Sequence, residues 1–288
     1  MSSWSGKTRG GVLGHKIFVF ILENLGLRFA YFILRFVSLY FVIFSRESEY
    51  IFFYFRKILK YNWYKSVTSL FNNYYIFGQT LLDKVALLGN FKNNITFDFD
   101  GEHYLHDMVK KGNGGILISA HIGNWEIAGN LLKRLDTKVN IVMYDAEHQS
   151  IKKYISKVIT SSARINIIVI RDDFSHIFEI STALKNNELI CIHGDRYVAG
   201  SKTIQAQLFG RNAKFPSGPF LLADRFKVPY SYVFAMKETP SHYHFYASPP
   251  SLNERGVTGM VDEYTETLEK IILKYPEQWF NYYKFWEN

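Results

Sequence analysis

The sequence is poor in cysteine, because Cys191 is the only one among its 288 residues. A single cysteine excludes a disulfide framework within the chain and agrees with a reducing compartment. Cys191 lies inside the apolar run Leu189–Ile192. The run predicts a buried strand, so we interpret Cys191 as a core residue and not as a nucleophile.

The apolar region Lys16–Phe44 lacks an uncharged stretch of the roughly 20 residues that span a bilayer, since the longest is Phe36–Ser45. Glu23 also interrupts the apolar core that a signal peptide needs, and no small-residue cleavage site follows. Lysine and arginine can reach the headgroups from helices that lie in the membrane interface. We therefore expect residues 1–45 to form a basic lead-in and apolar membrane-attachment helices. A tilted single span with Arg35 near its edge, or a helical hairpin in the protein core, is the alternative.

Metal-binding and nucleotide-binding signatures are missing: the chain has no HExxH, no Walker A loop and no dinucleotide fingerprint. His103 and His106 share a helical face, and His242 and His244 share a strand face, but no third ligand stands at a suitable spacing. We expect neither a metal nor a cofactor. The net charge of +8 is spread through aromatic segments without a zinc finger, an RNP-type box or a dense basic stripe. This pattern favours an anionic membrane surface over nucleic acid as the partner.

Short β-branched runs alternate with helical patterns through the middle of the chain. Strands are expected at Ile95–Phe99, Gly115–Ala120, Val139–Met143, Ile165–Ile170 and Leu189–His193, with helices at His103–Lys111, Ile127–Arg134, Ser150–Ser161 and Phe174–Asn186. Such alternation predicts an α/β domain, residues 46–288, with a mainly parallel central sheet flanked by helices. Tyr230–Met236 and His242–Ala247 predict an antiparallel edge, Gly200–Pro219 a polar loop, and Thr258–Lys274 an amphipathic helix.

The segment Gly114–Arg134 carries the candidate chemistry, GGILISAHIGNWEIAGNLLKR. A buried strand ends just before His121, and Asn124 stands where a helix N-cap belongs, so Glu126 falls in the first helical turn. The turn between strand and helix can fold the imidazole of His121 back onto the carboxylate of Glu126. The pair then suits a general base and the group that orients it.

The segment AHIGNWEIAG resembles the HxxxxD/E block of the lysophospholipid acyltransferase superfamily, in the form found in the lipid A biosynthesis lauroyl/myristoyl (late) acyltransferases. Further blocks of that family follow in order: GDR at 194–196, LFG at 208–210 with KFPSGP at 214–219, VP at 228–229 and YPEQW at 275–279. The resemblance covers most of the chain. It implies a membrane-attached acyltransferase with His121 as base and Glu126 as its orienter.

The resemblance also implies residues for the anionic part of the substrate. Asp195 and Arg196 match the block that contacts the polar part of the substrate, and the planar guanidinium suits a phosphate. Arg164 resembles the arginine of another block, with Arg171 as its rival. Ser217 and Gly218 precede a helix, whose free backbone N–H groups can bind an anion or an oxyanion.

The expected reaction is transfer of a fatty acyl chain from a thioester to a hydroxyl or amine of a lipid acceptor. The donor implied by the family is acyl carrier protein, with coenzyme A as the alternative. The acceptor is by default a lipid A precursor at the cytoplasmic face of the bacterial inner membrane, and an aminolipid or polyene-type pigment is the other possibility. A non-catalytic membrane-associated binding protein of the same fold is the competing hypothesis.

Overall fold

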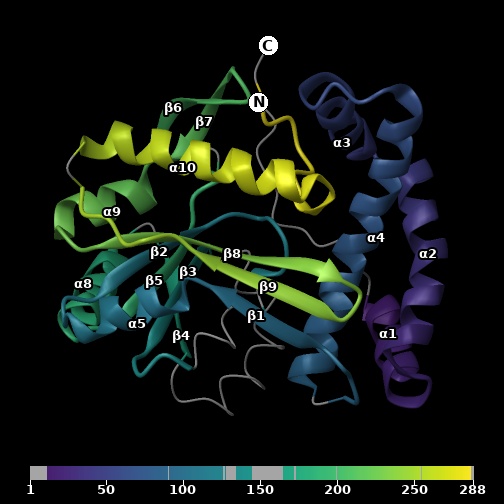
Figure 1. Ribbon diagram of the computed structural model, residues 1–288, viewed down its shortest axis with the longest axis horizontal. Helices are drawn as coiled ribbons and strands as arrows, with labels where there is room; N and C mark the ends of the chain where they lie inside the picture. Colours follow the sequence, from purple (N-terminus) through teal and green to yellow (C-terminus); the bar gives the residue numbers. More distant parts are fainter. Residues whose placement is uncertain are drawn as a thin grey trace.

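A computed structural model of the protein describes residues 12–89, 91–125, 127, 134–144, 165–171, 173–198, 200–253 and 255–286. Within these ranges a seven-stranded sheet crosses the molecule in the order β1-β9-β8-β2-β5-β3-β4 (Figure 1). Its strands are β1 (Thr96–Asp100), β2 (Gly115–Ser119), β3 (Val139–Tyr144), β4 (Ile165–Ile170), β5 (Leu189–His193), β8 (Tyr230–Thr239) and β9 (His242–Ala247).

The sheet is mainly parallel, as the sequence predicts. Strands β8, β2, β5, β3 and β4 pair in parallel, whereas β9 is antiparallel to β8. The predicted antiparallel edge is therefore present, but β1 pairs with β9 in parallel and forms the outermost strand on that side. The carboxyl ends of β2, β5 and β8 meet at one edge of the sheet, which is where α/β proteins hold their active sites.

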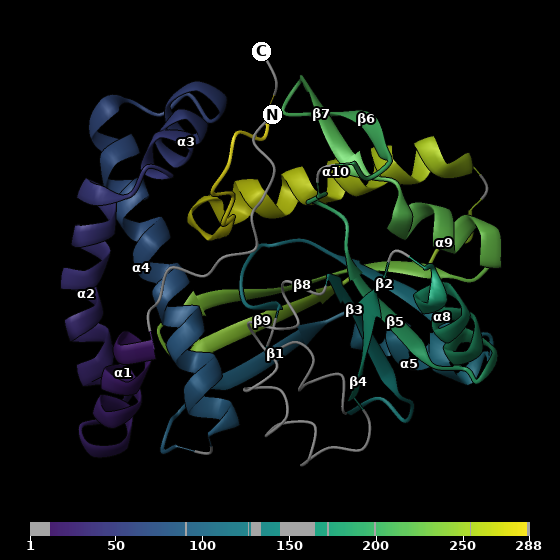
Figure 2. The ribbon, with the colours of Figure 1, turned by 180° about the vertical axis from the view of Figure 1, so that it is seen from behind.

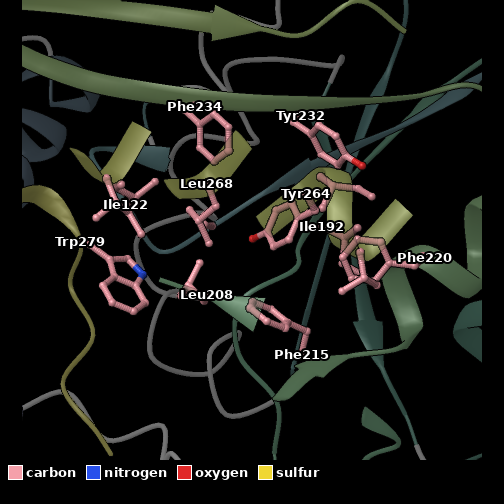
Figure 3. Close-up of a cluster of buried hydrophobic side chains, with 14 of the residues drawn as sticks. Ile122, Ile192, Leu208, Phe215, Phe220, Tyr232, Phe234, Tyr264, Leu268 and Trp279 are labelled. Atoms are coloured by element: carbon pink, nitrogen blue, oxygen red, sulfur yellow. The ribbon is translucent and has the colours of Figure 1, made fainter. Parts of the chain in front are cut away.

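Both faces of the sheet are covered by helices, because β2 is apolar on each side. Ile116 and Ile118 pack in a cluster that includes residues of α8 (Ser175–Lys185), α9 (Gly218–Phe226) and α10 (Gly256–Lys274). Leu117 points the other way and packs with the apolar face of α5 (Glu102–Lys110). Figure 3 shows part of the first cluster, where Tyr264 and Leu268 of α10 meet Phe215, Phe220 and Trp279. All five residues of β2 are buried, so the strand holds the loop that leaves its carboxyl end in a fixed place.

The stretch predicted as a polar loop, Gly200–Pro219, contains a β-hairpin instead. Strands β6 (Thr203–Leu208) and β7 (Arg211–Pro216) pair in antiparallel fashion and pack beside α10 (Figure 2). Phe209 and Gly210 between them have positive φ angles of 54° and 67°, as the two central residues of a type I′ hairpin turn require. The buried residues of the hairpin alternate along the strands, and two of them are only alanines, Ala206 and Ala213. Burial of small side chains gives a weak hydrophobic pattern.

The amino-terminal helices pack against the α/β part. They are α1 (Val12–Asn24), α2 (Gly26–Phe44), α3 (Ser48–Phe53), continued by a π-helical turn at Tyr54–Ile58, and α4 (Trp63–Leu88). Figures 1 and 2 both show α2 lying alongside α4 at one end of the sheet. The helices approach closely, because a Cβ atom on Gly78 of α4 would stand 2.4 Å from a methyl carbon of Leu34 on α2.

One face of α2 is buried and the opposite face is strongly apolar and exposed. Ala30, Tyr31, Leu34 and Ser38 form the buried face. Among the described residues of α1 and α2, the exposed large apolar side chains are Ile17, Phe20, Phe29, Phe32, Phe36, Leu39, Tyr40, Ile43 and Phe44; we call this set the apolar face. By length and composition α2 could cross a membrane. The apolar helix makes this region a candidate for membrane attachment.

Candidate active site

His121 lies two residues beyond the end of β2, and its imidazole is buried against a carboxylate. The Nδ1 atom of His121 is 2.8 Å from Oδ1 of Asp195. The backbone N–H of His121 donates to the other carboxylate oxygen, Oδ2, at 2.9 Å. Asp195 itself follows β5, which pairs directly with β2. Two adjacent parallel strands therefore bring the imidazole of His121 and the carboxylate of Asp195 to the same edge of the sheet.

The contact between His121 and Asp195 determines where the hydrogen of the imidazole lies. Burial by itself raises the pKa of Asp195, but the charge of His121, its hydrogen bond, and the nearby Arg196 and His193 outweigh that effect and lower the pKa below its ordinary value. An ionised carboxylate can only accept, so Nδ1 of His121 carries the hydrogen and donates it to Asp195. Nε2 is then the ring nitrogen without a hydrogen, as the acceptor nitrogen of a general base must be, and the negative charge of Asp195 can stabilise an imidazolium.

Two further rings surround the imidazole. The ring centroid of His193, at the end of β5, is 4.4 Å from that of His121, and the indole of Trp125 is 5.1 Å away. Trp125 and His193 also meet edge to face at 5.7 Å. His193 was not among the residues predicted from the sequence. The sequence feature that could have identified His193 is its position at the end of a predicted strand, immediately before the block Gly194–Arg196.

The loop after β2 is held by its backbone from two sides. The N–H of Gly123 donates to the carbonyl of Gln278 at 2.9 Å, and the N–H of Asn124 donates to the carbonyl of Ala235 in β8 at 2.7 Å. On the other side, the N–H of Phe280 donates to the carbonyl of His121 at 3.1 Å. The aromatic carboxyl-terminal segment thus packs against the loop that follows β2.

The predicted site residues divide into three groups. Asp195 contacts His121 directly, and Arg196 donates a hydrogen bond to the carbonyl of Phe280 beside the same loop. Ser217 instead donates both its N–H and its hydroxyl to the carbonyl of Lys202, at 3.0 and 3.1 Å, and Gly218 begins α9. Glu126 and Arg164 lie outside the described residues.

The remaining candidates have other surroundings. Arg171, the rival of Arg164, is exposed and donates to Ser175 and Glu179 near the start of α8. Nε2 of His244 stands 3.1 Å from Asp100, so this histidine belongs to the outer strands β9 and β1. Cys191 is half-buried in β5, and burial raises the pKa of its thiol to about 12. A thiol that stays protonated near neutral pH is a poor nucleophile, in keeping with the sequence interpretation.

The same cluster offers the atoms of a possible metal site. One ligand atom each from His121, His193 and Asp195 lies within 4.8 Å of the others. In the structure, however, Nδ1 of His121 donates to Oδ1 of Asp195, and the backbone N–H of His121 donates to Oδ2. A cation bound to Nδ1 of His121 would have to replace the hydrogen bond between this atom and Asp195. The geometry therefore suits an acid–base pair better than a metal centre.

Comparison with known proteins identifies the family of this chain. A search of curated proteins finds no match. A family model described as bacterial lipid A biosynthesis acyltransferase matches residues 72–288, which includes the loop after β2, the segment after β5 and the β6–β7 hairpin. The chain therefore belongs to the bacterial lipid A biosynthesis acyltransferases, enzymes that transfer an acyl group from a donor to a lipid acceptor.

Proposed function

We propose that this enzyme transfers a fatty acyl chain from a thioester of acyl carrier protein to a hydroxyl or amine of a lipid A precursor, as the lauroyl/myristoyl late acyltransferases do. The family supports the class of reaction. The single observation that carries the assignment of the base is the buried hydrogen bond from His121 to Asp195 at the carboxyl edge of the sheet. A coenzyme A thioester is the alternative donor.

The proposed reaction begins with Nε2 of His121. It takes the proton of the acceptor hydroxyl or amine while the acceptor atom attacks the thioester carbonyl, giving a tetrahedral intermediate. Collapse of that intermediate forms the ester or amide bond and breaks the carbon–sulfur bond. The leaving thiolate receives the proton that His121 carries, so the base is restored. Asp195 holds the ring in place and stabilises its charge between the two proton transfers.

Other predicted residues keep the roles that the resemblance gives them. We propose that Arg196 and Arg164 bind anionic groups of the substrate. In the Ser217–Gly218 segment, we propose that Gly218 supplies the backbone N–H at the start of α9, because the N–H of Ser217 is donated to Lys202. Glu126 stays the predicted orienter of His121. Because Nδ1 of His121 already donates to Asp195, we propose Asp195 as a second carboxylate acting on the same base.

We further propose that the apolar face of α1 and α2 attaches the enzyme to the cytoplasmic face of the inner membrane. The inner face of α2 packs on α4, and Tyr31 donates to Asp83 of α4. If α2 crossed the bilayer it would carry α4 and the turn between β8 and β9 to hydrocarbon depth. A helix lying along the surface avoids this cost, and its exposed Arg28 and Arg35 can reach anionic headgroups.

The test is to incubate the detergent-purified enzyme with fatty acyl carrier protein or acyl-coenzyme A and a total bacterial lipid extract, and to identify acylated products by mass spectrometry. We expect an acylated lipid A precursor with the carrier protein donor. Replacement of the base, His121→Ala, should lower turnover by about 10²–10⁴-fold. The matched control is His103→Ala, which removes an exposed histidine from α5.

Each outcome bears on a separate part of the proposal. Acylation of an aminolipid or pigment instead would overturn the acceptor, and acyl transfer only from coenzyme A would overturn the donor. Unchanged turnover in His121→Ala would overturn the assignment of the base. The absence of any acylated product would support the non-catalytic alternative.

A further inference from the structure

A buried polar cluster joins the apolar helix α2 to the α/β part of the enzyme. At its centre is the carboxylate of Asp83 on α4, which accepts hydrogen bonds from the hydroxyls of Tyr31 on α2 and Tyr243 on β9. The ammonium of Lys237 on β8 pairs with the same carboxylate and also donates to the carbonyl of Pro240 at 2.9 Å. The side chains of Asp83 and Lys237 are 0% and 3% exposed.

The cluster continues directly into the catalytic loop. The side-chain amide of Asn124, three residues after His121, donates to the hydroxyl of Tyr243 at 3.2 Å and to the carbonyl of Thr80 on α4 at 3.1 Å. A second connection runs through the backbone of Lys237, whose N–H and carbonyl both bond to the side chain of Gln278. The carbonyl of Gln278 in turn accepts the N–H of Gly123.

Stability alone is a poor explanation for these charges. Removing a lysine and an aspartate from water costs free energy that their mutual attraction often does not recover, and apolar replacements of buried pairs are frequently neutral or stabilising. In agreement, burial lowers the pKa of Lys237 although Asp83 raises it. A buried pair of this kind can instead fix one arrangement of the elements that contribute to it. Here those elements are α2, α4, β8 and β9.

We propose that four residues, Tyr31, Asp83, Lys237 and Tyr243, are positioning residues. They link the packing of α2 against the α/β part to the geometry of the His121–Asn124 loop. This inference rests on the proposed function for its kinetic readout. The four residues act on the loop through Asn124 and Gln278. The helix with the apolar face is thereby part of the catalytic unit and more than an anchor. A change in how this helix contacts the membrane is transmitted to the His121–Asn124 loop through the hydrogen bonds of the cluster.

The main test replaces the pair by neutral residues of similar size, Asp83→Asn/Lys237→Met, which keeps an acceptor for the two tyrosines. The matched control makes the same two changes in an exposed pair on α5, Asp107→Asn/Lys110→Met. We expect the cluster variant to keep the melting temperature of the wild type within the range of the control. Its kcat should fall by about 10- to 100-fold with little change in KM, because misplacement of a base affects turnover more than binding.

A milder variant isolates the contribution of α2. Tyr31→Phe removes only the hydroxyl that links α2 to Asp83 and leaves the ring in place. We expect a smaller loss of kcat in the same direction, and the exposed Tyr64→Phe at the start of α4 should have no effect. Because Phe fills the same space, this variant should fold even if the double variant is destabilised.

Hydrogen exchange gives a readout that does not depend on activity. In the cluster variant the amides of Gly123 and Asn124 should exchange about tenfold faster, while those of Ile116–Ser119 in β2 stay protected. Unchanged exchange of the loop together with unchanged kcat would overturn the coupling. If the wild-type enzyme showed no acyl transfer, the proposed function would fail, and the exchange measurement alone would still decide whether the cluster positions the loop.

Discussion

At the scale of single residues, the negative charge of Asp195 faces the imidazole of His121 inside the protein. Replacing it by asparagine, Asp195→Asn, keeps the shape of the side chain but removes the charge that favours the Nδ1–H tautomer and stabilises the imidazolium. We expect kcat for acyl transfer to fall by about 10²–10⁴-fold. Steady-state kinetics should show this against Asp107→Asn, an exposed aspartate on α5, as the control. Near-wild-type turnover would remove Asp195 from the catalytic pair.

The same carboxylate makes stability depend on pH. The pKa of Asp195 is lower in the folded protein than its ordinary value of about 3.9. The stabilisation is therefore fully present above that ordinary value and is lost as the pH falls toward the folded-state pKa. The melting temperature of the wild type should exceed that of Asp195→Asn at pH 7, and the difference should shrink below about pH 4. A difference that grew on acidification would contradict the assigned direction of the shift.

The sequence could place His121 and Asp195 at one edge of the sheet but could not pair them. Both follow apolar runs that predict strands, and parallel strands share their carboxyl edge. That β2 and β5 are direct neighbours depends on strand order, which is set by contacts between distant segments. For that reason Asp195 was predicted to bind the substrate and Glu126 to orient the base, and the ring of His193 beside His121 was not predicted.

At the scale of the element, the turn after β2 requires a glycine. Gly123 has a positive φ angle of 62°, and a Cβ atom there would stand 2.0 Å from the carbonyl oxygen of Ala235. Gly210 in the β6–β7 turn has a similar φ angle of 67°, but nothing lies within 4 Å of its Cβ position. The two glycines thus have similar backbone conformations, but they differ in how much room there is for a Cβ atom.

This difference gives a matched pair of variants. Gly210→Ala should lower the free energy of unfolding by about 1–2 kcal/mol, the cost of left-handed backbone for a residue with a side chain. Gly123→Ala adds a collision with backbone and should cost about 2–5 kcal/mol, with loss of activity. Denaturant unfolding of both variants measures the difference. Equal costs would show that the loop moves to accept the methyl group.

Regular elements were predictable where burial leaves a strong pattern. The run Gly115–Ala120 has buried residues on both faces and forms β2 as predicted, and the predicted amphipathic helix agrees with α10 to within a few residues. The hairpin β6–β7 was missed because glutamine, arginine and asparagine occupy its exposed positions and alanine some of its buried ones. Its burial comes from α10, which is distant in sequence.

At the scale of the whole molecule, the predicted division into residues 1–45 and 46–288 stays a prediction. In the structure, α2 from the first part packs closely against α4 from the second. Leu34 fits against Gly78, and Tyr31 bonds to Asp83. Removing residues 1–45 would expose the inner face of α4 and take the Tyr31 hydroxyl away from Asp83 and Lys237. We infer that the two parts fold as one unit, although their sequences differ sharply in composition.

The apolar face of that unit gives the last prediction. Phe29, Phe32 and Phe36 project from α2 with 41%, 50% and 61% of their surface exposed. Replacing all three by serine should reduce partition into anionic vesicles by about 10²-fold or more, because full burial of one aromatic side chain contributes about 1.5–3 kcal/mol. The cluster of Tyr31 and Asp83 lies on the other face of the helix, so the fold should be retained.

Two controls make the measurement specific. Serine at Phe178, Leu252 and Leu273, which are 77%, 58% and 62% exposed elsewhere, changes the same number of apolar residues and should leave partition unchanged. High salt should not release the wild type from the vesicles, since apolar burial is not screened as surface charge is. Release by salt would mean that attachment depends on the excess of lysine and arginine, and equal loss in both triple variants would mean that no single face of the molecule binds the membrane.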